Sequence, residues 1–228
     1  MISPEVSVGL ILDALHAQPP RSPGTGRALM IVSARANEDS IGVARAVALA
    51  SSLGAVYAID LDLRRNGLAH SLLASGQPMG PRIDAALGGA ALWGVCNAAG
   101  RLVREASAYA FHRLGRTNLY VGALNPRAIP SGGRVTISSA PSYWENVRAG
   151  GATAVVCAPA LSESEISLRI AQHMDGVVLI VGSDAGSAPA ALAAKNALDR
   201  AGANVMGLVY AGVSAPVMAM ERLRRQIG

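Results

Sequence analysis

The stretch ALMIVSARANEDSIGVARAVALASSL, residues 28–53, decides the fold of this chain. The apolar run at its start is typical of a buried strand, and the small apolar residues from Gly42 onward predict a helix. A strand that enters a helix through a short polar loop is the layout of a phosphate-binding loop, because amide groups at the start of the helix face the loop. This loop has a single glycine, Gly42, and no lysine follows it.

Composition limits the class of protein. The 228 residues fit one domain, although two small ones are not excluded, and the 51% apolar content is enough for a sizeable core. Aromatic residues make up only 4%, so the core has to be built from Ala, Val, Leu and Ile, as in a parallel sheet covered by helices. The net charge of +5 comes from dispersed arginines, which argues against nucleic-acid binding and only weakly supports an acidic partner.

The two cysteines, Cys96 and Cys157, have no Cys or His neighbour at metal-ligand spacing. A reduced, cytoplasmic chain is the simplest expectation. The first residues do not read as a signal peptide, because a basic start is missing and Asp13 interrupts the apolar run. The longest apolar runs are too short for a membrane span.

Strands and helices are predicted to alternate along the chain. We expect strands at 28–33, 55–60, 118–123, 153–157, 177–182 and 205–210, and helices at 4–17, 42–53, 68–75, 82–93, 99–113, 141–149, 163–173, 187–201 and 215–227. This order predicts a three-layer α/β/α sandwich around a mostly parallel, doubly wound sheet of about six or seven strands. Ligand sites in such folds lie at the carboxyl ends of the strands.

The N-terminal segment is expected to precede the main domain as a separate helix and arm. Residues 1–27 are predicted to form an amphipathic helix followed by a flexible arm rich in Pro and Gly, and residues 28–228 the main domain. The apolar stripe of the helix is a candidate for self-association and consists of Val8, Ile11, Leu12 and Leu15.

Two carboxylates close the second predicted strand. Asp60 and Asp62 end the segment AVYAIDLDL, residues 55–63, and Arg64 and Arg65 follow. In a P-loop protein, carboxylates at this place face the magnesium ion and the attacking group. From the residues alone, a polar strand end with solvated carboxylates stays open as the other reading.

The segment IDLDLRRNGLAHSLL, residues 59–73, resembles the second Asp motif of bacterial tyrosine autokinases. Further similarities to that family follow in the same order at 84–95, 117–126, 155–161 and 174–213, so the resemblance covers residues 28–213. The wider superfamily is that of the deviant Walker ATPases, which includes partition and division-site ATPases. The resemblance implies a P-loop NTPase-like fold.

The loop departs from the chemistry that this resemblance implies. If Gly42 matches the last glycine of the P-loop, Val43 stands in place of the lysine and Ala44 in place of the magnesium-binding Ser or Thr. No other register supplies a lysine, and the chain's single lysine, Lys195, lies on a predicted C-terminal helix. Glu38 and Asp39 add negative charge where phosphates would sit, which opposes nucleotide binding.

The other motifs depart in the same direction. Cys157 stands at the Walker B aspartate position, and a buried thiol is a poor ligand for magnesium. Arg45 could approach an anion at the helix start, or it could be solvated or salt-bridged. We therefore expect Gly42, Arg45, Asp60 and Asp62 to be vestiges of a nucleotide site, with no catalytic residue, metal or cofactor. Asp60 and Asp62 are expected to cap a helix or to pair with Arg64 or Arg65.

The resemblance implies a partner as well as a fold. The kinases of this family associate with a membrane-embedded chain-length regulator (a polysaccharide co-polymerase) and with one another. They control the export of extracellular polysaccharide of the capsule or holdfast type. We expect a catalytically inactive pseudokinase of this kind, forming homo-oligomers or hetero-oligomers with a catalytic paralogue at the cytoplasmic side of the membrane. Two alternatives stay open. One is a divergent active ATPase or tyrosine kinase, and the other is a degenerate partition or division-site positioning protein with peripheral membrane contact through 215–227.

Overall fold

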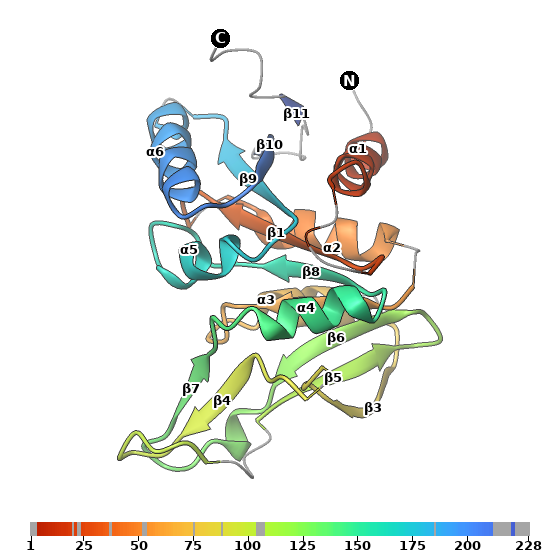
Figure 1. The fold of residues 1–228 in the computed structure, drawn as a ribbon, viewed down its shortest axis with the longest axis vertical. Coiled ribbons are helices and arrows are strands. Elements are labelled where there is room, and N and C mark those ends of the chain that lie inside the picture. The colour runs from red at the N-terminus through yellow and green to blue at the C-terminus, as the bar shows by residue number, and fades with distance from the viewer. Residues whose placement is uncertain are drawn as a thin grey trace.

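The computed structural model describes residues 4–19, 21, 24–36, 38–51, 54–74, 76–87, 89–103, 108–184, 186–211 and 220–221. Within these residues a nine-stranded sheet has the order β11-β10-β9-β1-β8-β2-β6-β5-β3, and a separate two-stranded ribbon pairs β4 with β7 (Figure 1). The strands are β1 (Arg27–Ser33), β2 (Val56–Asp60), β3 (Met79–Asp84), β4 (Trp93–Cys96), β5 (Tyr109–Leu114), β6 (Leu119–Leu124), β7 (Arg134–Ile137), β8 (Thr153–Cys157), β9 (Gly176–Gly182), β10 (Val205–Ala211) and β11 (Met220–Glu221).

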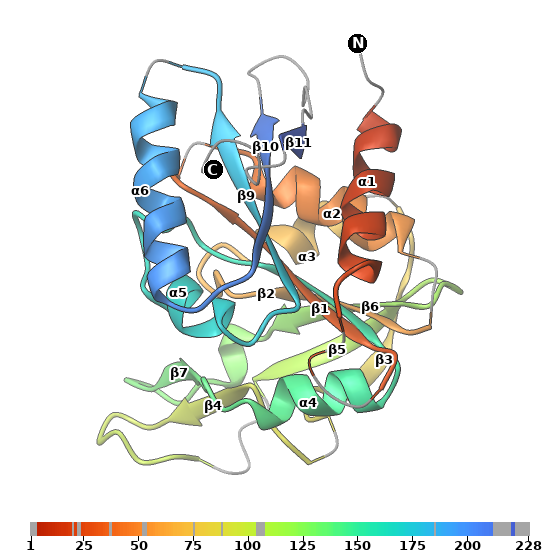
Figure 2. The ribbon, with the colours of Figure 1, turned by 45° about the horizontal axis from the view of Figure 1, so that its top comes forward.

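Helices cover both faces of the sheet (Figure 2). They are α1 (Pro4–His16), α2 (Ser40–Ala50), α3 (Gly67–Leu73), α4 (Ser142–Ala149), α5 (Ile166–Ala171) and α6 (Ser187–Arg200). Side chains alternate along β1: Leu29 and Ile31 pack in the cluster that holds α1, α2 and α3, whereas Met30 packs in the cluster that holds α4, α5 and α6. The predicted three-layer α/β/α sandwich is therefore confirmed.

The central part of the sheet is parallel, as predicted. The strands from β10 to β6 in the sheet order pair in parallel, and all of them coincide with predicted strands. The sheet is wider than the predicted six or seven strands because antiparallel strands extend both edges. The strands β5 and β3 follow β6 at one edge, and β11 pairs with β10 at the other.

Three predicted helices need correction. The predicted helix 82–93 is wrong, because β3 occupies its first part, an isolated bridge joins Leu87 to Ala90, and β4 begins at Trp93. The predicted helix 99–113 is also wrong, because β5 begins at Tyr109. Of the predicted helix 215–227, only Met220 and Glu221 are described, and they form a strand. The remainder, including the proposed membrane contact, lies outside the described residues.

Helix α1 packs against helix α2. Val8, Ile11 and Leu15 are buried in the cluster formed with α2, and Leu12 is half-buried. The apolar stripe that we considered for self-association is thus largely covered within the chain. In the part of the chain that the structure describes, no helix is long and apolar enough to cross a membrane.

Most of the aromatic side chains gather in one cluster on the α4 side of the sheet. Of the two Trp, five Tyr and one Phe in the chain, only Tyr210 lies outside it. The rings of Trp93 and Tyr109 stack with centroids 3.6 Å apart, and Tyr143 meets Trp144 at 85°. These rings fill the space between β4, β5 and α4, where a sheet of small aliphatic residues alone would leave voids.

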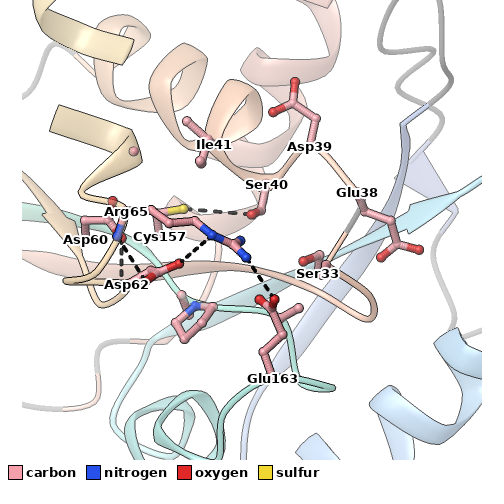
Figure 3. A pocket seen from close by; sticks show the side chains of 15 residues that line it. Ser33, Glu38, Asp39, Ser40, Ile41, Asp60, Asp62, Arg65, Cys157 and Glu163 are labelled. Carbon is pink, nitrogen blue, oxygen red and sulfur yellow. Dashed lines mark hydrogen bonds and ion pairs between the residues drawn. The ribbon is translucent and has the colours of Figure 1, made fainter. Parts of the chain in front are cut away.

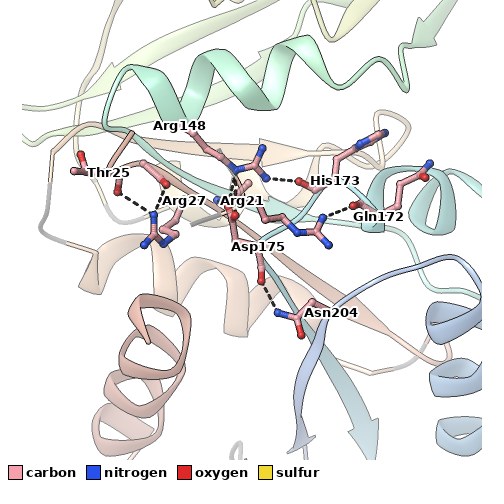
Figure 4. A network of polar contacts seen from close by, with 10 residues as sticks. Arg21, Thr25, Arg27, Arg148, Gln172, His173, Asp175 and Asn204 are labelled. Carbon is pink, nitrogen blue, oxygen red and sulfur yellow. Dashed lines mark hydrogen bonds and ion pairs between the residues drawn. The ribbon is translucent and has the colours of Figure 1, made fainter. Parts of the chain in front are cut away.

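A buried ion pair ties α4 to the amino ends of β1 and β9 (Figure 4). The Nε atom of Arg148 lies 3.0 Å from Oδ2 of Asp175, and the two side chains are 6% and 0% exposed. The same carboxylate accepts a hydrogen bond from the backbone N–H of Ala28 at 2.7 Å. Arg148 also donates to the carbonyl oxygen of His173. Because every charge in this network has a partner, the attraction and the hydrogen bonds offset the desolvation penalty of burying it.

Candidate functional site

The carboxyl ends of β1, β8 and β2 meet at a small cavity below the start of α2 (Figure 3). The cavity has a volume of about 70 Å³, whereas pockets for small-molecule ligands are usually about 300–1,000 Å³. Its lining is Ser33, Ala36, Glu38, Asp39, Ser40, Ile41, Asp60, Asp62, Arg65, Gly67, Cys157, Ala158, Pro159, Ala160 and Glu163. The cavity is where a P-loop would hold phosphates, and its volume is below the usual range of small-molecule pockets.

Asp39 caps helix α2. Its Oδ1 atom accepts a hydrogen bond from the backbone N–H of Gly42 at 2.7 Å. A Cβ atom added at Gly42 would lie 2.2 Å from Asp39 Oδ2, so a side chain there would displace the capping carboxylate. The start of a helix attracts anions because its first N–H groups are unpaired and its dipole is positive at that end. In this chain, its own carboxylate already occupies that position.

Glu38 fills the interior of the loop. Its side chain is 1% exposed, Oε2 accepts from the backbone N–H of Arg35 at 2.9 Å, and Oε1 accepts from the backbone N–H of Gly182 at 2.8 Å. The guanidinium of Arg35 lies 3.4 Å from the same Oε1 atom. The carboxylate therefore ties the loop after β1 to the end of β9, and it occupies the backbone N–H of Arg35 within the loop.

Arg35 carries this connection further, to the start of α6. Its Nη2 atom lies 2.5 Å from Oδ2 of Asp184 and donates to the hydroxyl of Ser187 at 2.7 Å. The hydrogen bond from Arg35 holds the pKa of the Asp184 carboxyl below its ordinary value. Arg35 therefore pairs with Glu38 and Asp184 and connects the loop after β1 to the start of α6.

Asp60 and Asp62 serve as backbone acceptors. Asp60 is buried, and its two oxygens accept from the N–H groups of Asp62 at 2.8 Å and Leu68 at 2.9 Å. Burial raises the pKa of Asp60 to about 6, although both hydrogen bonds oppose that rise. Asp62 accepts from the N–H of Arg64 at 3.2 Å, and its Oδ2 lies 3.6 Å from Nε of Arg65. The expected helix cap and arginine pairing are both present, since Leu68 lies in the first turn of α3.

Arg65 bridges the two sides of the cavity. Besides Asp62, it contacts Glu163, with Nη2 and Oε1 3.0 Å apart (Figure 3). The sequence did not identify this bridge, because Glu163 belongs to a different strand–helix connection and its position carries no motif. Ser33 and Ser40 were missed in the same way, since a lone serine gives no signal of the cavity that it lines.

Cys157 lies at the floor of the cavity and is buried. Its Sγ atom is 3.9 Å from the hydroxyl of Ser40, and burial raises the pKa of the thiol well above its ordinary value, so the thiol is neutral at physiological pH. A neutral thiol does not replace the carboxylate that holds magnesium in a P-loop enzyme. Across the described residues, no group of three or more His, Cys, Asp or Glu side chains could hold a metal ion.

The remaining residues singled out in the sequence lie away from the cavity. Gly42 is in the first turn of α2 and Arg45 in the second, and neither belongs to the cavity lining. Lys195 is on α6, on the opposite face of the sheet from α2, where its Nζ atom pairs with Asp199 at 2.5 Å. Asn37 lies outside the described residues. The site thus combines Asp60 and Asp62 with Glu38, Asp39 and Cys157, and no lysine reaches it.

Comparison with known proteins identifies the fold. No family model and no curated protein matches the chain. Among solved structures, the kinase domain of the Escherichia coli tyrosine kinase ETK is 17% identical, with a TM-score of 0.58 over 92% of this chain and 75% of that one. The chimerical protein CapA2B2 is 14% identical (TM-score 0.55; 91% and 84% covered), and the VpsO kinase domain is 17% identical (TM-score 0.51; 90% and 91% covered).

These similarities define the class of fold. The chain has the fold of bacterial tyrosine kinase domains, which is a P-loop NTPase-like architecture, and the fold expected from the sequence resemblance is confirmed. At identities of 14–17% the comparison reaches no further than the fold. What the site does has to be argued from its own residues.

Replacing Glu38 by glutamine tests whether this carboxylate is needed as the acceptor for the backbone N–H groups of Arg35 and Gly182. A glutamine keeps one acceptor oxygen but turns an NH₂ group toward the N–H of either Arg35 or Gly182, so one buried donor loses its partner. We expect the free energy of unfolding to fall by about 1–3 kcal/mol. Urea denaturation of the variant measures this, with Glu165→Gln, an exposed glutamate at the start of α5, as the matched control. Equal stability of the two variants would contradict the role of Glu38 as a buried acceptor for backbone N–H groups.

Proposed function

We propose that this chain is a pseudokinase, a protein with the tyrosine kinase fold that neither binds nor hydrolyses nucleotide. One observation carries the proposal: at the place where a P-loop binds phosphates, the carboxylates of Glu38 and Asp39 accept hydrogen bonds from the backbone N–H groups of Arg35 and Gly42. A bound phosphate would have to displace both carboxylates or approach them closely. Two like charges about 4 Å apart repel by several kcal/mol at an intermediate effective dielectric.

The surroundings of the cavity support the same proposal. Lys195 is paired with Asp199 on the other face of the sheet, so no ammonium group is at hand to neutralise β- and γ-phosphates. Asp62, which would face magnesium in an active relative, is engaged by Arg65 and by backbone N–H groups. Cys157 offers a neutral thiol where a carboxylate is needed.

A protein that keeps the kinase fold but lacks the residues for nucleotide chemistry can still bind other proteins. We infer that the chain acts as an assembly partner of a membrane polysaccharide chain-length regulator, as its sequence resemblance to bacterial tyrosine autokinases implies. Because the loop after β1 is held by Glu38 and Arg35 rather than by a γ-phosphate, the assembly surface needs no nucleotide. Export of an extracellular polysaccharide is the process that such a partner would serve.

Calorimetric titration of the full chain with ATP and Mg²⁺ tests this function. We expect no saturable, magnesium-dependent binding at millimolar ATP, because the carboxylates of Glu38 and Asp39 already accept hydrogen bonds from the backbone N–H groups of Arg35 and Gly42 at the loop. Recovery of the chain-length regulator from membranes with the purified chain should likewise be the same with and without ATP. The matched control is Asp62→Ala, which removes the carboxylate that would face a metal.

Micromolar, magnesium-dependent ATP binding that is lost in Asp62→Ala would overturn the pseudokinase proposal and favour a divergent active enzyme. Failure to recover any polysaccharide-export protein would overturn the proposal that the partner is a chain-length regulator.

A further inference from the structure

A second and larger depression lies beside the cavity. It has a volume of about 760 Å³ and lies between the loop after β2, strand β7 and the start of α5. Its lining is Leu61, Asp62, Leu63, Arg64, Arg65, Leu124, Arg134, Val135, Thr136, Ile137, Pro159, Glu163, Ser164, Ile166 and Arg169, and we call it the arginine groove. Like other ligand sites of α/β folds, it is at the carboxyl ends of parallel strands, here β2, β6 and β8.

Arginines from separate elements converge on this groove. Arg64 and Arg65 follow β2, Arg134 opens β7, and Arg169 belongs to α5. The lining also holds the carboxylates Asp62 and Glu163, and both of them contact Arg65. Within the described residues, the guanidinium groups of Arg64, Arg134 and Arg169 have neither an ion-pair nor a hydrogen-bond partner.

The charge of the groove is therefore positive. The lining holds four arginines and two carboxylates, so its formal net charge is +2, and both carboxylates contact Arg65 rather than the other three arginines. A concave surface of one sign focuses the electrostatic potential and raises the local concentration of oppositely charged ligands. Guanidinium groups are suited to phosphates because they donate two parallel hydrogen bonds to a pair of oxygens.

The groove offers apolar contacts as well. Leu61 and Ile166 are buried, and Leu63, Leu124 and Ile137 are half-buried, so each lines the groove with an aliphatic side chain. A ligand made only of charged groups would leave these side chains unused. The volume falls within the range of small-molecule pockets, about 300–1,000 Å³, in contrast to the cavity at the loop.

We propose that the arginine groove binds a small organic phosphate, a molecule with an apolar body and a phosphate group, without magnesium. The phosphate contacts Arg64 and Arg169. The apolar body lies on the aliphatic floor of the groove, which consists of Leu61, Leu63, Leu124, Ile137 and Ile166. This site does not depend on the pseudokinase proposal, because it uses none of the loop amides around Glu38 and Asp39.

Titration with naphthyl phosphate, followed by its fluorescence in the presence of EDTA, tests the site on the full chain. We expect saturable binding that is at least several-fold tighter than that of inorganic phosphate, because only the former can use the aliphatic floor. Arg64→Gln and Arg169→Gln should each weaken binding about tenfold, the loss of one charge-assisted contact. The control Arg200→Gln removes an exposed arginine at the end of α6, outside the groove lining, and should leave the affinity unchanged.

The two proposals fail in distinguishable ways. Binding at the loop cavity would require magnesium and would be insensitive to Arg169→Gln, whereas binding at the groove needs no magnesium and is sensitive to it. Absence of saturation overturns the groove proposal. So does equal affinity for naphthyl phosphate and inorganic phosphate, or unchanged affinity in both arginine variants. Thermal unfolding of each variant, followed by circular dichroism, checks that the exposed substitutions leave the fold intact.

Discussion

Replacing Arg148 by methionine should lower the free energy of unfolding by about 3–5 kcal/mol. The substitution leaves the carboxylate of Asp175 buried, at 0% side-chain exposure, with the N–H of Ala28 as its remaining partner. An unpaired charge in such an environment is far more costly than the pair was favourable. The carbonyl of His173 loses its donor as well, which adds to the loss.

Urea denaturation of Arg148→Met measures this effect, and Arg116→Met is the matched control. Arg116 lies in the exposed turn between β5 and β6, so its replacement should change stability by less than about 0.5 kcal/mol. Arg148→Met combined with Asp175→Leu should be more stable than Arg148→Met alone, because it no longer buries a lone charge. A double variant that is less stable by the sum of the two single losses would show that the ion pair has no such coupling.

Stability should also fall as the pH rises from about 4 to 6, because Asp60 is buried. Its pKa is raised from 3.8 to about 6 in the folded chain, so the folded state holds this proton more tightly than the unfolded state does. A group of this kind stabilises the fold fully below its unfolded pKa, and that contribution is lost as the pH passes its folded pKa. A shift of about two units corresponds to about 3 kcal/mol.

Unfolding free energies of the chain and of Asp60→Asn, measured from pH 3.5 to 7, isolate this contribution. The asparagine is neutral throughout, so the difference between the two stability curves should change by about 3 kcal/mol across the window and be constant outside it. Parallel curves over the whole range would mean that Asp60 ionises in the fold as easily as in the unfolded chain.

The parallel core was predictable because its strands are apolar throughout. The segment GVVLIVG, for example, forms β9 and is buried on both faces. A short continuous apolar run of this kind is typical of a strand in a parallel sheet that is covered on both faces. The antiparallel edge was not predictable in the same way. DAALGGAALWGV and the residues before Leu114 are rich in Ala and Leu, which favour helices, and only pairing with β6 and β7 makes strands of the parts around Trp93 and Tyr109.

The candidate site was predicted in part for a similar reason. Asp60, Asp62 and Cys157 end neighbouring parallel strands, so their meeting follows from the strand order. The pairing of Glu38 with the N–H of Gly182 spans 144 positions and involves a backbone group, so no side-chain pattern announces it. The sequence could show that acidic residues stand where phosphates would bind, but not that their carboxylates accept hydrogen bonds from backbone N–H groups.

The aromatic cluster has a consequence for how this molecule can be observed. Both tryptophans, Trp93 and Trp144, lie on the α4 side of the sheet, and the half that contains α1, α2 and α3 has none. Intrinsic fluorescence therefore reports on one layer, whereas far-ultraviolet circular dichroism reports on all helices. If the two signals change together on heating, the layers unfold as one cooperative unit. If fluorescence changes separately, the layer beneath α4 is a unit of its own.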